Sequence, residues 1–112
     1  MNDTQKSNVE ISQDLSAGAL SQTTTFGRRF KLESIEIHIN VAITETITIS
    51  KVLVDGTAIV IGTGDLVAET DYVHFPRYND TYLPGEEIKI QCTNANLTGT
   101  LTGVIKTSAL LQ

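Results

Sequence analysis

The sequence predicts an all-β protein that folds as a single β-sandwich of jelly-roll type, with seven or eight short strands. Three observations support this prediction. Apolar residues recur at every second position in short segments, β-branched residues are abundant in these segments, and turn-forming residues separate them at intervals of about 8–15 residues. An amphipathic helix needs apolar residues at three- and four-residue spacing, and no convincing segment of that kind is present.

The clearest alternation lies in the first third of the chain. Apolar residues occupy the odd positions from Ile35 to Val41, and polar residues lie between them. This is the pattern of a strand with one buried and one exposed face. Upstream, Phe30 and Leu32 occupy even positions. A strand changes the parity of its inward face only through an extra residue, so the sequence predicts a β-bulge or bend between Leu32 and Ile35.

The next segments predict a β-hairpin. Residues 42–45 are expected to form a loop, and residues 46–54 a strand rich in Thr and Ile. Asp55-Gly56 between two apolar runs predicts a two-residue type I′ turn with both residues at positive φ. The return strand is expected at residues 57–61.

Three further strands are expected at residues 72–76, 88–92 and 100–110. The sequence LPGE at residues 83–86 has Pro and Gly at the two central positions that a type II turn prefers. The alternation in residues 72–76 predicts that Phe75 belongs to the core.

The chain is expected to divide into a polar N-terminal arm, residues 1–21, and the β-sandwich domain, residues 22–112. The apolar residues of the arm are too widely spaced for one helical stripe: Val9, Ile11, Leu15 and Leu20. We therefore expect the arm to be flexible in the isolated chain and to become ordered only against another chain, because ordering a segment costs conformational entropy.

Composition excludes several classes of function. A chain of 112 residues with a net charge of −5 is about one domain and lacks the basic surface of a nucleic-acid-binding protein. No run approaches the length of a membrane-spanning helix, and the N-terminus lacks the features of a signal peptide. The single Cys92 excludes an intramolecular disulfide and a cysteine-based metal site, and its place in an alternating strand predicts that it is buried.

No motif predicts an enzyme, a metal site or a cofactor site. The two histidines, His38 and His74, each lie on the polar side of an alternating segment and are expected at the surface. Sequence alone leaves two alternatives open. One is a pair of glycosidase carboxylates, and the other is a calcium site formed by loop acids: Asp65, Glu69, Asp71, Asp80, Glu86 and Glu87.

Five residues are candidates for contact with a partner or ligand. Tyr78, Asn79 and Tyr82 lie in a polar, turn-rich segment, where exposed tyrosines can stack on sugars or anchor a protein interface. Arg28 and Arg29 form a short basic cluster. This cluster is expected to protect a strand edge or to provide one side of an ion pair.

Taken in order, these segments resemble the small jelly-roll auxiliary and decoration proteins encoded among the structural genes of tailed bacteriophages. The resemblance covers residues 26–107 and rests on five segments: FGRRFKLESIEIHIN, VAITETITISKVLVDG, TDYVHFP, LPGEEIKIQCTNAN and TGTLTGVIK. Pro84 through Asn94 match the turn-strand-loop element of that family, and Leu101 through Ile105 match its final Gly-containing strand.

The resemblance implies a non-enzymatic virion protein, a capsid decoration or cement protein that binds and stabilises the phage head surface. Its partners would be the major capsid protein or other virion proteins, and it would form a homo-oligomer, with a trimer favoured. Nucleic acid and membrane partners are not expected. The alternative is a carbohydrate- or receptor-binding β-sandwich module of a phage tail or surface protein, with the segment from Tyr78 to Tyr82 as the contact.

Overall fold

The computed structural model describes residues 4–18, 20–25, 27–76, 81–92 and 98–110. These residues form strands joined by antiparallel pairing, with one 3-10 turn: β1 (Thr4–Asp14), η1 (Leu15–Ala17), β2 (Leu20–Thr25), β3 (Phe30–Val52), β4 (Ala58–His74), β5 (Thr81–Tyr82), β6 (Glu87–Cys92) and β7 (Thr100–Leu110). The predicted all-β class is therefore confirmed. Within the described ranges, no helix is long and apolar enough to cross a membrane.

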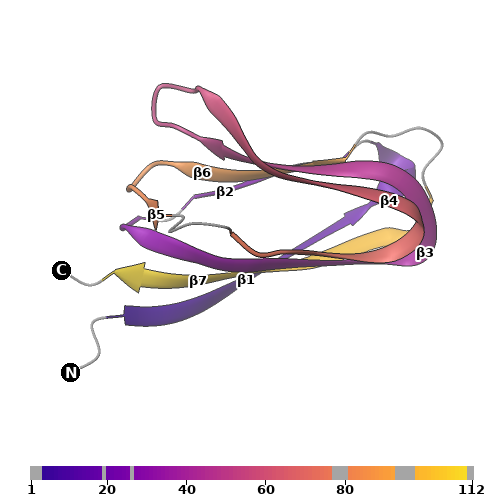
Figure 1. Cartoon of the computed structure of the whole chain (residues 1–112), viewed down its shortest axis with the longest axis horizontal. Helices are drawn as coiled ribbons and strands as arrows, with labels where there is room; N and C mark the ends of the chain where they lie inside the picture. The colour runs from indigo at the N-terminus through magenta and orange to yellow at the C-terminus, as the bar shows by residue number, and fades with distance from the viewer. Residues whose placement is uncertain (1–3, 19, 26, 77–80, 93–97, 111–112) are drawn as a thin grey trace.

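Two long strands, β3 and β4, connect the two layers of the sandwich. Residues Phe30–Ile39 of β3 pair with β7, whereas residues Ile47–Val52 pair with β6. Figure 1 shows β3 and β4 running together along the lower layer, bending at the right of the view and continuing in the upper layer. The lower layer also contains β1 and β7, and the upper layer contains β2 and β6. This arrangement is compatible with a jelly roll.

The core between the layers consists mainly of isoleucine and leucine side chains that alternate inward along each strand. The predicted change of parity is confirmed, because the β3–β7 ladder shifts register between Leu32 and Ser34. Phe30, Leu32, Ile35 and Ile37 are all buried despite their different parities. The bulge thus lets one strand present two offset apolar runs to the same core.

The loop expected at residues 42–45 is not observed. β3 continues through this segment, and its register against β4 shifts around Ile43, where both strands bend. Ala68 of β4 has a φ of 52°, and its backbone N–H donates to Thr44 Oγ1 at 3.0 Å. The N–H of Val67 donates to a side-chain oxygen of Glu69 at 3.1 Å. Nearby polar side chains therefore accept the hydrogen bonds of these two backbone groups at the bend.

The return strand is also longer than expected. The sequence predicted that it ends near residue 61, but β4 continues to His74. The weak alternation of its middle part reflects exposure, since most side chains between Gly62 and Thr70 face solvent and only Leu66 is buried. A strand with little burial shows little hydrophobic periodicity.

The prediction that residues 1–21 form a flexible arm outside the domain is wrong for the described residues of this segment. β1 pairs with β7 over its whole length, and η1 is tied to the domain by the Leu15 N–H, which donates to the Gly99 carbonyl at 2.9 Å. Ile11, Leu15 and Leu20 are buried in the core. These apolar residues are widely spaced because β1, η1 and β2 each contribute one of them to the core. They pack within their own chain.

The hairpin at Asp55-Gly56 is confirmed, but its turn differs from the prediction. Leu53 and Thr57 are joined by a backbone hydrogen bond of 2.8 Å, and the Gly56 N–H donates to the Leu53 carbonyl. The loop therefore contains three residues. Gly56 has a φ of 92°, whereas Asp55 is not among the residues with positive φ. A three-residue loop that ends in a left-handed glycine is the next most common hairpin type.

We expect Gly56→Val to lower the free energy of unfolding by about 1–3 kcal/mol, because a β-branched residue is strained at this φ. No heavy atom lies near the position of an added Cβ, so the effect would come from the backbone and not from a clash. Urea unfolding of the variant and of the wild type would measure the difference. An unchanged midpoint for Gly56→Val would contradict the assigned conformation.

The structure revises two residues near the end of β4. Phe75, expected in the core, is 71% exposed, and His74, expected at the surface, is buried. In this segment the even positions therefore face the core, opposite to the prediction. The turn at residues 83–86 agrees with its prediction, since Gly85 has a φ of 89° and the Glu86 N–H donates to the Leu83 carbonyl at 3.0 Å.

Candidate functional site

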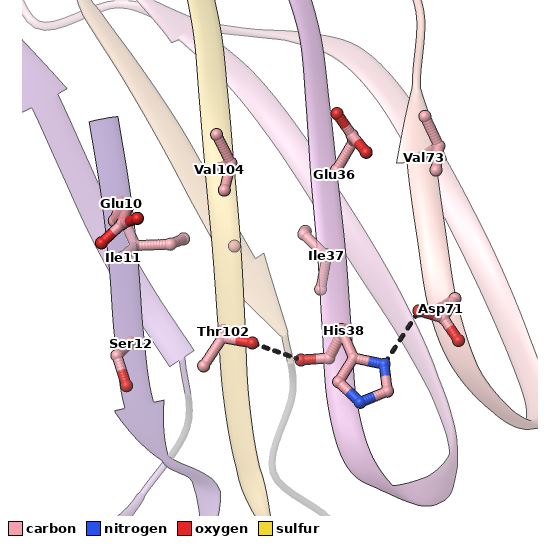
Figure 2. Close-up of a pocket in the computed structure, with 11 residues that line it drawn as sticks. Glu10, Ile11, Ser12, Glu36, Ile37, His38, Asp71, Val73, Thr102 and Val104 are labelled. Carbon is pink, nitrogen blue, oxygen red and sulfur yellow. Dashed lines mark hydrogen bonds and ion pairs between the residues drawn. The ribbon is translucent and has the colours of Figure 1, made fainter. Parts of the chain in front are cut away.

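The candidate functional site is a groove of about 670 Å³ on the outer face of the lower layer. It crosses four neighbouring strands, β1, β7, β3 and β4, as Figure 2 shows. Its lining residues are Glu10, Ile11, Ser12, Glu36, Ile37, His38, Asp71, Val73, Thr102, Gly103 and Val104. We call this surface the sheet groove.

Strand register places the outward side chains of the sheet groove in two rows across the four strands. One row contains Ser12, Thr102, His38 and Asp71, and the other contains Glu10, Val104, Glu36 and Val73. These residues alternate along each strand with residues that face the core, such as Ile37. The site is thus assembled from positions up to 94 residues apart along the chain, from Glu10 to Val104.

The first row contains a histidine–carboxylate pair. His38 Nδ1 lies 2.9 Å from Asp71 Oδ1, and both side chains are more than half exposed. The Thr70 hydroxyl donates to the other carboxylate oxygen at 2.6 Å. The Thr70 hydrogen bond first, and the His38 contact second, hold the pKa of Asp71 below its usual value. Asp71 is therefore a carboxylate at neutral pH.

The second row combines acidic and apolar groups. Glu36 forms an ion pair with Lys106, whose position lies next along β7 beyond the groove. Val104 lies between Glu10 and Glu36, and Val73 lies on the other side of Glu36 (Figure 2). The sheet groove therefore presents apolar surface bordered by three carboxylates, those of Glu10, Glu36 and Asp71, which suits a cation on an aliphatic stem.

The geometry does not support acyl transfer. A nucleophile must lie within hydrogen-bond reach of its base. The Thr102 hydroxyl, although it is in the same row as His38, is directed to the His38 backbone carbonyl at 3.4 Å (Figure 2). The Asp71 carboxylate thus orients the His38 imidazole, but among the described residues no hydroxyl or thiol is hydrogen-bonded to this imidazole as a nucleophile would be.

The predicted contact residues that the structure describes, Tyr82, Arg28 and Arg29, do not line this groove. Tyr82 was expected in an exposed loop but is fully buried, so the prediction that it contacts a partner or ligand is wrong. Its ring stacks on Phe30 with centroids 4.7 Å apart, and the Lys51 ammonium lies 4.9 Å from its centroid. Tyr78 and Asn79 lie outside the described residues.

Arg28 and Arg29 are exposed in the segment between β2 and β3. None of the ion pairs found among the described residues involves either arginine. The guanidinium groups therefore face solvent at the end of the sandwich where β3 begins. Whether they contact a partner remains a prediction.

The described acids that suggested a calcium site do not gather at one place, and Asp80 lies outside the described residues. Asp65 accepts a hydrogen bond from Thr46 at 2.7 Å, while Asp71 pairs with His38. Glu86 is buried, accepts from the Leu83 N–H at 2.8 Å and lies 3.6 Å from Lys51. Within the part of the chain that the structure describes, no three His, Cys, Asp or Glu side chains gather in a way that could hold a metal ion.

Cys92 is buried as predicted. Burial, and secondarily the negative charge of Glu45, raises the pKa of its thiol to about 11. We expect a disulfide reagent to react at neutral pH about a hundredfold more slowly with the folded chain than with the urea-unfolded chain, since only the thiolate is the nucleophile. Comparable rates in the two states would contradict burial.

The same shift predicts a loss of stability at high pH. The thiol of the unfolded chain ionises at its ordinary pKa, near 9, while the folded chain keeps its proton up to about 11. The contribution of Cys92 to stability is therefore complete below pH 9 and is lost as the pH rises through this range. Unfolding curves of the wild type and of Cys92→Ala between neutral and alkaline pH would measure the difference.

Sequence comparison identifies no relatives: no protein-family model and no curated protein matches the chain. Comparison of structures does find similar folds. A protein derived from the SPBc2 prophage, YomS, has a TM-score of 0.55 at 9% identity, and the match covers 95% of this chain and 96% of that one. A structure of Bacillus endospore appendages, described as disulfide-linked pili, has a TM-score of 0.54 at 14% identity, with 97% and 89% covered.

A structure of infectious bursal disease virus, Gx strain, is similar with a TM-score of 0.51 at 13% identity. The match covers 97% of this chain but only 34% of the viral chain, so this chain spans about a third of the length of that protein. At these low identities the three similarities show a shared fold. They do not show a shared function.

Proposed function

We propose that this chain is a non-enzymatic structural protein of a virus or phage particle, and that it attaches to the particle surface as a decoration or cement protein. Its partners would be the major capsid protein or other virion proteins. The mechanism would be mechanical: a rigid sandwich adds buried area at a junction of the shell. An interface of standard size, about 1,600 Å² in total, can supply stable attachment.

The observation that supports this proposal is the fold. Its two-layer sandwich is similar to structures from a virus, a prophage and a bacterial surface appendage. The fold also suits a mechanical role, because β3 and β4 run through both layers and connect them with continuous backbone. Separating the layers would require breaking these strands' ladders.

An exposed apolar surface at the β3–β4 hairpin is a suitable attachment surface. The hairpin projects at the upper left of Figure 1. Val54, Ile59 and Val60 are each about half exposed or more, and Val54 lies against Gly85 in the turn that also exposes Leu83. Apolar surface clustered at one end of a small protein commonly marks a protein interface. We call this surface the hairpin tip.

The alternative, a carbohydrate-binding module, has less support. It depended on exposed tyrosines in residues 78–82, and Tyr82 is buried beneath Lys51 and against Phe30. Among the described residues that line the sheet groove, none is a Phe, Tyr or Trp on which a sugar ring could stack.

Cosedimentation of the purified chain with particles assembled in its absence would test the proposal. We expect saturable binding at a constant number of copies per particle. Replacing Val54, Ile59 and Val60 by serine should weaken this binding at least about tenfold, because a truncated central anchor typically costs 2 kcal/mol or more. Val67→Ser is the matched control, since Val67 is 68% exposed but lies at the bend of β4, away from the hairpin tip.

All variants would first be compared by thermal unfolding, which should be unchanged because the substituted side chains are exposed. Absence of binding to both head and tail preparations by the wild type would refute a virion role. Binding that the hairpin substitutions leave unchanged would refute the hairpin tip as the attachment surface. Binding to a glycan array without binding to particles would favour the alternative function.

A further inference from the structure

We propose that the sheet groove binds the Arg28-Arg29 segment of a second copy of this chain, so that copies associate through a loop-in-groove contact. This inference does not depend on attachment to a particle. It concerns two surfaces that the proposed function leaves unused. The sheet groove lies on the outer face of the lower layer, whereas the hairpin tip lies at one end of the sandwich.

The first argument is charge complementarity. The sheet groove carries the carboxylates of Glu10, Glu36 and Asp71, and the cation observed beside them is Lys106, which pairs with Glu36. Among the ion pairs of the described residues, none joins Glu10 or Asp71 to a lysine or an arginine. Two guanidinium groups would match these two carboxylates, and arginine binds carboxylates through paired hydrogen bonds.

The second argument is the mixed chemistry of the groove. Val73 and Val104 provide apolar surface beside the acidic residues, and an arginine side chain carries its guanidinium on an aliphatic stem of methylene groups. An arginine can therefore lay its stem on the valines while its head reaches a carboxylate. A small inorganic cation would leave the apolar surface uncovered.

The third argument is the distance between the arginines and the groove within one chain, which is too long for an intramolecular contact and therefore requires a second copy. Arg29 immediately precedes β3, and Glu36 lies seven residues further along the same strand. At about 3.3 Å per residue the separation is about 23 Å, well beyond an arginine side chain. The loop and the groove are thus different surfaces of one rigid layer. Contacts between unlike surfaces can repeat from copy to copy and close into a ring, or can form twice in a two-fold dimer.

The test is a charge exchange followed by analytical ultracentrifugation at low ionic strength. The groove variant carries Glu10→Lys and Asp71→Lys, and the loop variant carries Arg28→Glu and Arg29→Glu. Each variant alone should associate at least about tenfold more weakly than the wild type, because like charges then face each other. An equimolar mixture should recover association, since the basic groove of one variant accepts the acidic loop of the other and the unchanged surfaces also match.

The control variant carries Asp65→Lys and Glu69→Lys, which change the net charge by the same amount as the groove variant but lie on β4 outside the groove. It should associate like the wild type. Added salt should weaken the association of the wild type, because the contact is partly exposed. The proposal is overturned if the wild type remains monomeric, if either variant associates like the wild type, or if the mixture associates no better than its components.

Discussion

Deletion of residues 2–20 is expected to abolish cooperative unfolding of the domain. β1 forms the ladder that covers β7, and Ile11, Leu15 and Leu20 are buried in the shared core. Replacing one buried leucine or isoleucine by alanine costs about 2–5 kcal/mol. A domain of this size has about 5–15 kcal/mol of stability in total, so losing three such side chains together with a strand exceeds what the fold can tolerate.

A graded series would separate core packing from loss of the strand. Leu15→Ala should lower the free energy of unfolding by about 2–5 kcal/mol. Asn8→Ala, an exposed position on β1, should have little effect. Circular dichroism during thermal unfolding would measure both variants and the truncated chain. A truncated chain with the melting curve of the wild type would show that residues 2–20 are an arm outside the core.

Tyr82→Ala is expected to destabilise the protein by about 3–5 kcal/mol, the usual range for removing a buried aromatic side chain. Tyr82 is fully buried, and its ring stacks on that of Phe30 at an interplanar angle of 11°. The Lys51 ammonium lies over the Tyr82 ring, 4.9 Å from its centroid. Lys51 also donates to the Thr81 carbonyl at 3.0 Å. The substitution would therefore remove the stacking contact and loosen the segment that positions Lys51.

Phe75→Ala is the matched control for this prediction. It removes an aromatic side chain that is 71% exposed and should change stability by less than about 0.5 kcal/mol. Tyr82→Phe keeps the ring and should lose much less than Tyr82→Ala. Urea unfolding would measure all three variants. If Phe75→Ala lowered the stability more than Tyr82→Ala, the result would contradict a buried Tyr82 and an exposed Phe75.

The sequence predicted those parts of the fold that depend on local pattern. The predicted alternation is confirmed from Ile35 to Ile39, whereas Val41 at its end is exposed. The parity change before it and the turn at residues 83–86 are also confirmed. Each confirmed feature follows from period-two burial or from the backbone preference of Pro and Gly. The final strand was predicted with the observed bounds, Thr100–Leu110. Short-range physics determines these features.

Features that depend on tertiary pairing were missed. Residues 4–14 look like a polar arm because a strand at the edge of a layer needs few buried residues, and only its partner β7 makes it a strand. The sheet groove was missed for the same reason. Glu10, Glu36 and Asp71 belong to three strands, and only the register places them side by side. The one available signal was that Glu36 and His38 occupy adjacent outward positions of a single strand.

The pairing of β1 with β7 has a consequence for biosynthesis. The ladder joins residues 4–14 to residues 100–110, so β1 cannot be paired until β7 has been synthesised. The β3–β4 hairpin can form much earlier, because its partners are close in the sequence and closing a short loop costs less entropy. Until β7 has been synthesised, the part of β3 from Phe30 to Ile39 lacks this partner. Completion of the lower layer, and with it of the core, must therefore wait for the synthesis of β7.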